Sequence, residues 1–361
     1  MLMAAAAFLV SCVDQSKKLL QTLTPMPSDT PSPKPSQTPS PAPSQTPSQI
    51  ATQPPKPTAT SQVESHEVKN PQEGMNLATV YMTTAISADG LLKMYQTLGR
   101  AAKGKVAVKI SSGEPGGHYF LSPDFIAPLV KEVIGTIVEC NTTYGGRRTT
   151  AASHLKVMEE HSFTAIAPVD IMDADGNMSI AIVGGKHLKE DVVGSHFANY
   201  DFVVNLAHFK GHAMGGFGGV IKNMSIGIAS PQGKCLIHTA GTSSTSPWGG
   251  DQDNFLESMA EAAKGVADYL GENILYIDVM NNLSVDCDCD NSPAAPTMKD
   301  IGILASLDPV ALDQACVDLV YAAPDGKDLV ERMESRHGIH TLEHAEAIGF
   351  GNRKYELVSI D

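Results

Sequence analysis

Residues 202–223 read FVVNLAHFKGHAMGGFGGVIKN, and they predict both a strand and a site. The first six residues are almost entirely apolar, which is typical of a strand buried on both faces of a sheet. The next sixteen hold two histidines, two lysines, an asparagine and five glycines, with no carboxylate. Glycines let a backbone approach a ligand closely, and histidines and lysines offer metal coordination or positive charge. α/β proteins usually carry their chemistry at strand ends of this kind.

Short apolar runs alternate with helical patterns along the rest of the chain. Strands are expected at residues 106–110, 136–139, 164–167, 179–183, 202–206, 274–279, 301–305 and 355–360. Helices are expected at residues 123–134, 149–161, 254–270 and 341–348, and another has Asp308 as its N-cap and Pro309 as its first residue. This alternation predicts an α/β fold with a largely parallel or mixed sheet and flanking helices, as one large domain or two intimate subdomains.

The N-terminal sequence predicts export and a tether. Residues 1–10 are apolar, and Leu9-Val10-Ser11-Cys12 resembles a bacterial lipobox, in which the cysteine becomes the lipidated first residue after cleavage. No Lys or Arg precedes this run, which leaves the translation start open, and the alternative is a stray apolar terminus. Residues 25–57 contain 12 of the 23 prolines, and such a composition predicts disorder.

We therefore divide the chain into a lipoprotein-type signal segment (1–12), a disordered linker (13–64) and an α/β domain (65–361). The expected product is a lipoprotein anchored at the cell surface or in the periplasm, with membrane contact through the N-terminal lipid only. The chain carries a net charge of −14, and residues 1–64, with four lysines against three acidic residues, leave −15 on the remainder. That balance argues against nucleic acid as a partner.

Two histidines in the opening stretch, His208 and His212, are candidate metal ligands because they lie four residues apart. The glycines favour a loop there, in which this spacing is less decisive. The alternative is a strand end whose imidazole is satisfied by backbone. Lys222 is a candidate catalytic residue, and with Asn223 it can hold a phosphate or carboxylate of a substrate, or simply begin a helix.

Residues 286–290 read DCDCD and follow an expected strand. Carboxylates beside Cys287 and Cys289 raise the pKa of a thiol and disfavour the thiolate, whereas a bound cation reverses that penalty. A C-x-C pair is a weaker metal signal than two C-x-x-C pairs. The alternatives are a strained disulfide or two unrelated small residues in a turn.

Other segments offer weaker candidates. Cys235 and His238 can join a metal site, and Cys316 belongs to the apolar face of its helix. Two glycine-rich strand exits suit a small anionic ligand, with a structural turn as the alternative for the second; their candidate residues are Lys109 and Glu114, and Asn141, Tyr144 and Arg147. Residues 170–177 read as a turn between strands, since the spacing of a calcium loop is missing.

These segments together resemble the domain of unknown function 362 family, often labelled an uncharacterised iron–sulfur centre protein. The matching stretches are KVAVKISSGEPGG, ECNTTYGGRRTTAASHL, HFKGHAMGGFGGVIKNMSIG, GKCLIH, VDCDCD and DIGILASLDPVALDQACVDL. The iron–sulfur label belongs to members with a ferredoxin-type cysteine run, which this chain lacks. The resemblance nominates His208, His212, Cys287 and Cys289 as ligands, with His238 and Cys235 outside them. A more distant similarity is to nickel-dependent lactate racemase domains, at the level of fold.

Three functions follow as hypotheses. The first is an extracytoplasmic metal or Fe–S protein that performs redox chemistry on a small, anionic substrate with an unidentified redox partner. The second is a non-redox metal-dependent enzyme, an isomerase or hydrolase, and the third is a lipoprotein that binds a ligand and catalyses nothing. Export disfavours a cluster relative to a single zinc, iron or nickel ion. A shared site requires His208 or His212 to lie within metal-ligand reach of Cys287 or Cys289.

Overall fold

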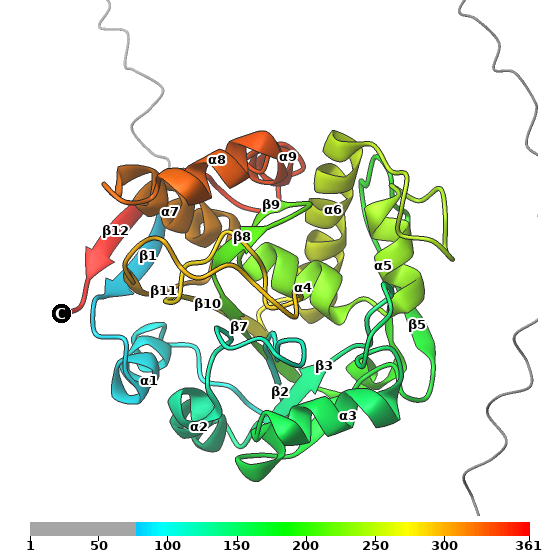
Figure 1. Cartoon of the computed structure of the whole chain (residues 1–361), viewed down its shortest axis with the longest axis horizontal. Coiled ribbons are helices and arrows are strands. Elements are labelled where there is room, and N and C mark those ends of the chain that lie inside the picture. The colour runs from blue at the N-terminus through cyan, green and yellow to red at the C-terminus, as the bar shows by residue number, and fades with distance from the viewer. Residues whose placement is uncertain (1–76) are drawn as a thin grey trace, which may run out of the picture. The chain divides into compact units, whose positions relative to one another are not determined.

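A computed structural model describes residues 77–361 (Figure 1). The expected signal segment, the lipidation candidate Cys12, the linker and the start of the α/β domain lie outside the described residues. No helix in the described part of the chain is long and apolar enough to cross a membrane.

An eight-stranded mixed sheet forms the centre of the described structure. Its strands, in spatial order, are β12 (Tyr355–Ser359), β1 (Ala78–Thr83), β11 (Gly302–Ser306), β10 (Ile274–Met280), β7 (Phe202–His208), β2 (Val106–Lys109), β3 (Thr136–Glu139) and β4 (Val169–Ile171). The five strands from β10 to β4 are mutually parallel, β11 is antiparallel to both of its neighbours, and β12 is parallel to β1. The α/β fold expected from the sequence is therefore confirmed.

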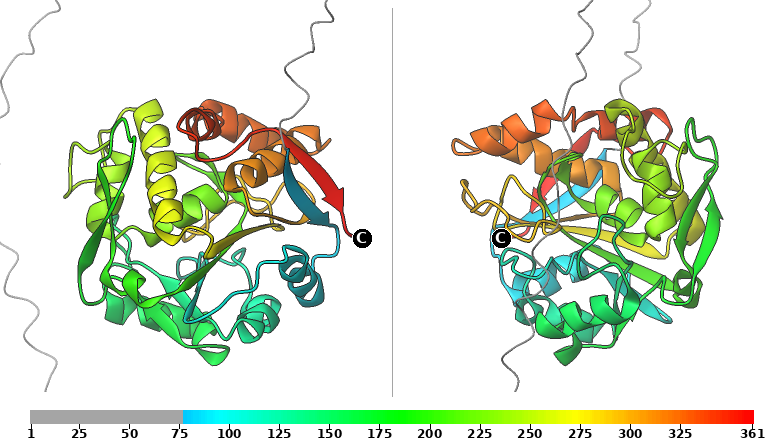
Figure 2. Two further views of the ribbon diagram at one scale, coloured as in Figure 1. Left: turned by 180° about the vertical axis from the view of Figure 1, so that it is seen from behind. Right: turned by 45° about the vertical axis from the view of Figure 1, so that its right-hand side comes forward.

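Helices cover both faces of this sheet, as Figures 1 and 2 show. One face carries α1 (Ala88–Thr97), α2 (Pro123–Glu132) and α3 (Ala151–Glu160). The other side holds α4 (Val220–Ile228), α5 (Pro231–His238), α6 (Gln252–Leu270), α7 (Pro309–Ala322), α8 (Lys327–Ser335) and α9 (His340–Ala347).

The central strands feed both layers because successive side chains of a strand point to opposite faces. In β7, Phe202, Val204 and Leu206 pack with the first helical layer, whereas Val203 and Ala207 pack with the second. All seven residues of β7 are buried. Burial on both faces explains why this strand appears in the sequence as a continuous apolar run.

Two expectations about strands need correction. Residues 164–167 do not form a strand, because Phe163–Ala165 is a 3-10 helix with Phe163 buried, and β4 begins only after Pro168, which has no N–H for the ladder. Residues 179–183 overlap β5 (Asn177–Ala181), which pairs with β6 (Glu190–Gly194) as a separate hairpin rather than within the main sheet. A second short 3-10 helix spans Ser195–Asn199.

The stretch that follows β7 is a hairpin rather than an open loop. Strands β8 (Lys210–His212) and β9 (Gly216–Gly218) pair antiparallel, and α4 begins at Val220. The chain leaves β2 toward β3 on one side, and β7 leads to β10 on the other. The β2–β7 boundary is therefore a topological switch point, where ligands bind outside the carboxyl ends of the strands.

A buried carboxylate from another helix caps α4. Asp313 of α7 accepts hydrogen bonds from the backbone N–H groups of Val220 (2.9 Å) and Ile221 (3.1 Å). Gly219 is required at the start of the helix, because a Cβ there would overlap the Asp313 carboxylate. Burial raises the pKa of Asp313 to about 6. Burial and the neighbouring Asp313 raise the pKa of Asp278 on β10 well above its ordinary value.

An Asp278→Asn variant is expected to be more stable than the wild type at alkaline pH. The unfolded chain releases the Asp278 proton near pH 4, whereas the folded protein keeps it, so the free energy of unfolding falls as the pH rises from about 4 through the raised pKa. Asparagine needs no proton, so the variant loses this dependence. Urea unfolding at about pH 5 and about pH 8.5 should show a gain of at least about 1 kcal/mol confined to the higher pH.

The exposed Asp268→Asn change on α6 serves as the matched control and should leave the pH dependence as in the wild type. If Asp278→Asn unfolds with the same pH dependence as the wild type, the protonated buried carboxyl is contradicted.

Candidate functional site

A cavity of about 320 Å³ lies at the carboxyl ends of β2, β3 and β7. Its walls come from the ends of β2 and β3, the β8–β9 hairpin, α4, α5 and the segment 287–289. Five cationic side chains line it, namely Lys109, Arg148, Lys210, Lys222 and Lys234, and Glu139 is its lining carboxylate. An anion is therefore the ligand that this cavity is suited to attract.

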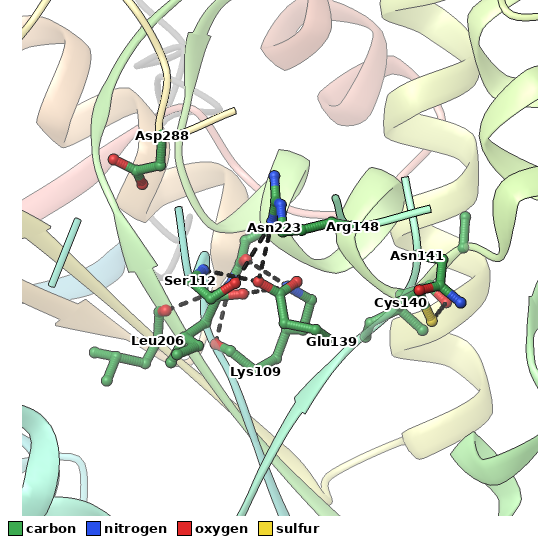
Figure 3. Close-up of polar contacts among 12 residues, drawn as sticks. Lys109, Ser112, Glu139, Cys140, Asn141, Arg148, Leu206, Asn223 and Asp288 are labelled. Atoms are coloured by element: carbon green, nitrogen blue, oxygen red, sulfur yellow. Dashed lines mark hydrogen bonds and ion pairs between the residues drawn. The ribbon is translucent and has the colours of Figure 1, made fainter. Parts of the chain in front are cut away.

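A buried ion pair at the ends of β2 and β3 anchors the cavity (Figure 3). Lys109 Nζ lies 3.0 Å from Glu139 Oε2 and 3.1 Å from Asn223 Oδ1. Asn223 Nδ2 in turn donates to the Lys109 carbonyl (3.0 Å) and to Asn205 Oδ1 (2.7 Å). Gly227 of α4 leaves room for the amine, because a Cβ there would lie 2.6 Å from Lys109 Nζ. Asn223 thus ties α4 to strands β2 and β7.

Glu139 stays ionised in this setting. Burial raises the pKa of Glu139, but Lys109 and Arg148 outweigh it and lower the pKa to about 2. Glu139 Oε1 also accepts the Ser112 backbone N–H at 2.7 Å.

A second buried ion pair supports the wall next to Glu139. Arg148 Nε donates to Glu114 Oε1 at 2.7 Å, and Tyr144 OH donates to the same oxygen at 2.9 Å. Tyr144 lines the cavity, whereas Glu114 pairs with Arg148 behind it. Arg147, the arginine favoured from sequence, does not reach the cavity: it is exposed and paired with Glu160. The sequence offers no signal that distinguishes Arg147 from Arg148 as the arginine at the cavity.

Asn141, also expected at the ligand, has a structural role instead. Its backbone N–H and its Nδ2 both donate to the Asp173 carboxylate, at 2.8 and 2.9 Å. Asn141 does not line the cavity, in contrast to Lys109, Tyr144 and Asn223.

A third buried cluster fastens the DCDCD segment to the strand end. Asp288 lies 3.0 Å from His208 Nδ1 and 2.8 Å from Lys210 Nζ. Burial raises the pKa of Asp288, but His208 and Lys210 outweigh it and hold the pKa well below its ordinary value. His208 Nε2 faces the Asn281 carbonyl at 2.7 Å, so both ring nitrogens donate to oxygens. His208 therefore has no free lone pair for a metal.

The paired cysteines lie against His212 at the cavity. One ligand atom each from His212, Cys287 and Cys289 lie within 4.8 Å of one another, close enough to share one metal ion. The expected pairing of the opening stretch with DCDCD is thus found for His212 and not for His208. Both thiols are free, so the disulfide considered from sequence is absent among the described residues.

The two thiols differ in ionisation. A hydrogen bond from Cys289, aided by Lys222 and Lys210, lowers the pKa of Cys287 well below its ordinary value despite burial. The same hydrogen bond raises the pKa of Cys289. Lys222 Nζ lies 3.8 Å from Cys287 Sγ, and the backbone nitrogen of Cys289 donates to the same sulfur at 3.3 Å. Cys287 is thus the cysteine of the pair whose thiolate form is favoured.

The imidazole of His212 is neutral and oriented by backbone. Burial, followed by the positive charge of Lys222, lowers the pKa of His212 well below its ordinary value. Its Nδ1 accepts the N–H groups of Gly215 (2.8 Å) and Met214 (3.3 Å). The proton of the neutral ring is therefore on Nε2, which makes His212 a hydrogen-bond donor.

The outer metal candidates lie apart from this group. His238 lines the cavity, donates from Nδ1 to the Lys234 carbonyl (2.7 Å) and stacks on Phe255. Cys235 lies beside Thr143 Oγ1 at 3.1 Å and does not line the cavity. Cys316 is fully buried, as expected.

Sequence reasoning missed several charged residues of the site, which are Glu139, Arg148, Lys210, Lys234 and Asp288. The sequence contained one signal for Glu139: a carboxylate at the end of an apolar strand is expected to be buried and then needs a nearby cation. The sequence contained no signal for Lys234, because its neighbours in the helix do not mark it as a cavity residue.

These features define an α/β protein with a cation-lined cavity and a paired-thiol site at the switch point of its sheet. Residues 106–318, more than half of the chain, match the family described as Domain of unknown function (DUF362), and the chain belongs to that family.

Among solved structures, the lactate racemase apoprotein from Thermoanaerobacterium thermosaccharolyticum is similar, with 14% identity and a TM-score of 0.42. The match covers 67% of this chain and 57% of that chain, so this chain spans less than two thirds of the racemase structure. No curated protein matches the sequence.

A Lys109→Met variant is expected to lose about 3 kcal/mol of unfolding free energy, because it leaves the Glu139 carboxylate buried without its nearest cation. The double variant Lys109→Met, Glu139→Gln should recover much of that loss, since no uncompensated charge remains. Urea unfolding of both variants and of Glu139→Gln alone completes the double-mutant cycle. A double variant no more stable than Lys109→Met would show that the ion pair is not what the two residues share.

Proposed function

We propose that this protein is a metal-dependent enzyme that acts on a small anionic molecule. The observation that carries the proposal is the grouping of His212, Cys287 and Cys289 within 4.8 Å at a cavity lined by five cationic side chains. Perturbed titratable groups that converge on a concave site are typical of active sites.

The donor set favours a single ion over a cluster. Two thiolate sulfurs suit a single zinc or iron ion. A [4Fe–4S] cluster takes four cysteines, whereas the group within mutual reach in residues 77–361 contains two. The chemistry of the donors thus fits one of the metals expected from the sequence.

We assign Cys287 and Cys289 as the protein ligands and His212 as a hydrogen-bond donor beside them. The Nδ1 lone pair of His212 is already engaged by backbone N–H groups, and its Nε2 carries the proton. A metal held by the two thiolates would act as a Lewis acid on an oxygen of the substrate. Lys222, next to Cys287, provides positive charge for the anionic group of the same molecule.

The pair of thiols also supports a second candidate, thiol–disulfide redox chemistry without a metal. A low-pKa thiolate beside a protonated cysteine is the arrangement that dithiol oxidoreductases use. The two functions differ in what they require, because the first needs a bound metal and the second needs a reversible Cys287–Cys289 disulfide.

Protein purified without chelators is expected to contain about one equivalent of zinc or iron, because the two thiolates of Cys287 and Cys289 suit one such ion. Cys287→Ser and Cys289→Ser should each lose most of it, whereas His212→Gln should retain it. Elemental analysis by mass spectrometry measures the metal, and Cys235→Ser is the matched control, because that thiol faces Thr143.

Retention of metal in both cysteine variants would defeat the assignment. Metal-free wild-type protein in which dithiothreitol reversibly reduces a Cys287–Cys289 disulfide, detected by mass after alkylation, would support the second candidate instead.

We further propose that the enzyme is exported and held at a membrane through a lipid on Cys12, on the strength of the lipobox-like Leu9-Val10-Ser11-Cys12. The full chain expressed in a bacterium should partition into the detergent phase and incorporate labelled palmitate, because acyl chains add membrane affinity. Cys12→Ser should abolish both, and Ser11→Ala is the neighbouring control. Labelling that persists in Cys12→Ser would refute the anchor.

A further inference from the structure

We infer that Lys234 forms a second anion-binding subsite in the cavity, and that the substrate is a small molecule with an acid group at each end, of the dicarboxylate class. This inference rests on the proposed function, because it places the other acid group at the cysteine pair and Lys222.

Lys234 is a buried amine without a carboxylate partner among residues 77–361, and burial lowers its pKa, an effect that a bound anion would oppose. It is 5% exposed and lines the cavity, and the hydrogen bond of its Nζ among residues 77–361 goes to the Ala229 carbonyl. No carboxylate in the described part of the chain lies within 4.0 Å of its amine. An ammonium has three protons to donate, so this group has donors left for a ligand.

The acidic groups around Lys234 are neutral or already engaged. Burial raises the pKa of Asp191 to about 8 and that of Cys140 to about 12, so neither is an anion near neutral pH. Asp173 accepts two hydrogen bonds from Asn141, and Glu139 pairs with Lys109. A buried ammonium without a counter-ion lowers the stability of the folded protein, and an anionic ligand would offset that loss.

The two subsites lie toward opposite ends of α4. Lys222 is in the first turn of the helix and approaches Cys287, whereas Lys234 reaches the carbonyl of Ala229, the C-cap of the helix. Seven residues of helix separate positions 222 and 229, or about 10 Å along the axis. Lys109 lies at the Lys234 end, where it contacts Gly227.

The charges of the cavity match two acid groups rather than one. Lys109, Lys210 and Arg148 each have a carboxylate partner, namely Glu139, Asp288 and Glu114. Lys222 and Lys234 have no carboxylate partner among residues 77–361. Two cations without a carboxylate partner, at two ends of the cavity, therefore favour a dianion whose charges are separated. A phosphate, which carries both charges on one group, or a monocarboxylate satisfies one end only.

Trp248 provides the measurement. It is the single tryptophan of the chain and lines the cavity, so its fluorescence should respond to a bound ligand. Metal-loaded protein is titrated with succinate, butyrate and inorganic phosphate at constant ionic strength. We expect succinate to bind at least about tenfold more tightly than butyrate or phosphate, since each charge-assisted contact contributes about a factor of ten.

Lys234→Met should abolish the preference for succinate and leave the metal content unchanged. The variant should fold at least as well as the wild type, because it removes a buried unpaired charge, and Lys234→Gln is a second variant should methionine pack poorly. Lys189→Met is the matched control, since that amine also donates to a backbone carbonyl, that of Gly185, but lies outside the cavity.

Equal affinity for succinate and butyrate in the wild type would overturn the inference, as would a preference that survives in both Lys234 variants. Tight binding of phosphate with no binding of succinate would overturn it as well. The proposed function fails separately, through absence of metal from the wild type, which the elemental analysis reports independently of any titration.

Discussion

The buried ion pair between Lys109 and Glu139 is the interaction on which the site depends. It joins the carboxyl ends of β2 and β3, and through Asn223 it fixes α4 against β7. Desolvation makes such a pair a poor source of stability compared with apolar residues of similar size. The ion pair contributes geometry instead. The Lys109 amine contacts groups from two strand ends and one helix, so it fixes this part of the cavity wall in one arrangement.

The carboxylates of the DCDCD segment do not determine the pKa of Cys287. From sequence they raise the pKa of neighbouring cysteines, yet the pKa of Cys287 is lowered. Asp288 is turned toward His208 and Lys210, and Asp286 pairs with Arg332. Asp286 and Asp288 are thus paired with cations outside the segment, and the hydrogen bond from Cys289, with Lys222 and Lys210, lowers the pKa of Cys287. The acids fasten the segment to the fold, and the cysteines are left facing the cavity.

The sequence was sufficient for the fold class, because apolar runs such as 202–206 and the N-cap signature at Asp308 depend on local pattern alone. The resemblance to the family also predicted that residues 208–223 lie beside the cysteines, and His212 does. The sequence could not show which histidine of that stretch lies beside the thiols, because His208 and His212 have the same chemistry. The turn into β8 directs His208 to Asp288 and His212 to the cavity. Arg147 and Arg148 likewise have the same chemistry and differ only in where the backbone places their side chains. Lys234 became visible only when α5 was placed against the end of α4, since neither its neighbours nor its spacing marks it as a cavity residue.

The cations of the cavity divide into two kinds, and the division separates structure from recognition. Lys109, Lys210 and Arg148 are each held by a carboxylate, so their charges are spent on maintaining the walls. Lys222 and Lys234 have no carboxylate partner among residues 77–361: Lys222 lies 3.8 Å from Cys287 Sγ, and Lys234 donates to the Ala229 carbonyl. A fold that keeps an uncompensated ammonium in its interior loses stability, which a bound anion restores by mass action. Lys234, whose burial the folded chain alone does not compensate, is therefore the residue from which we infer the charge of the ligand.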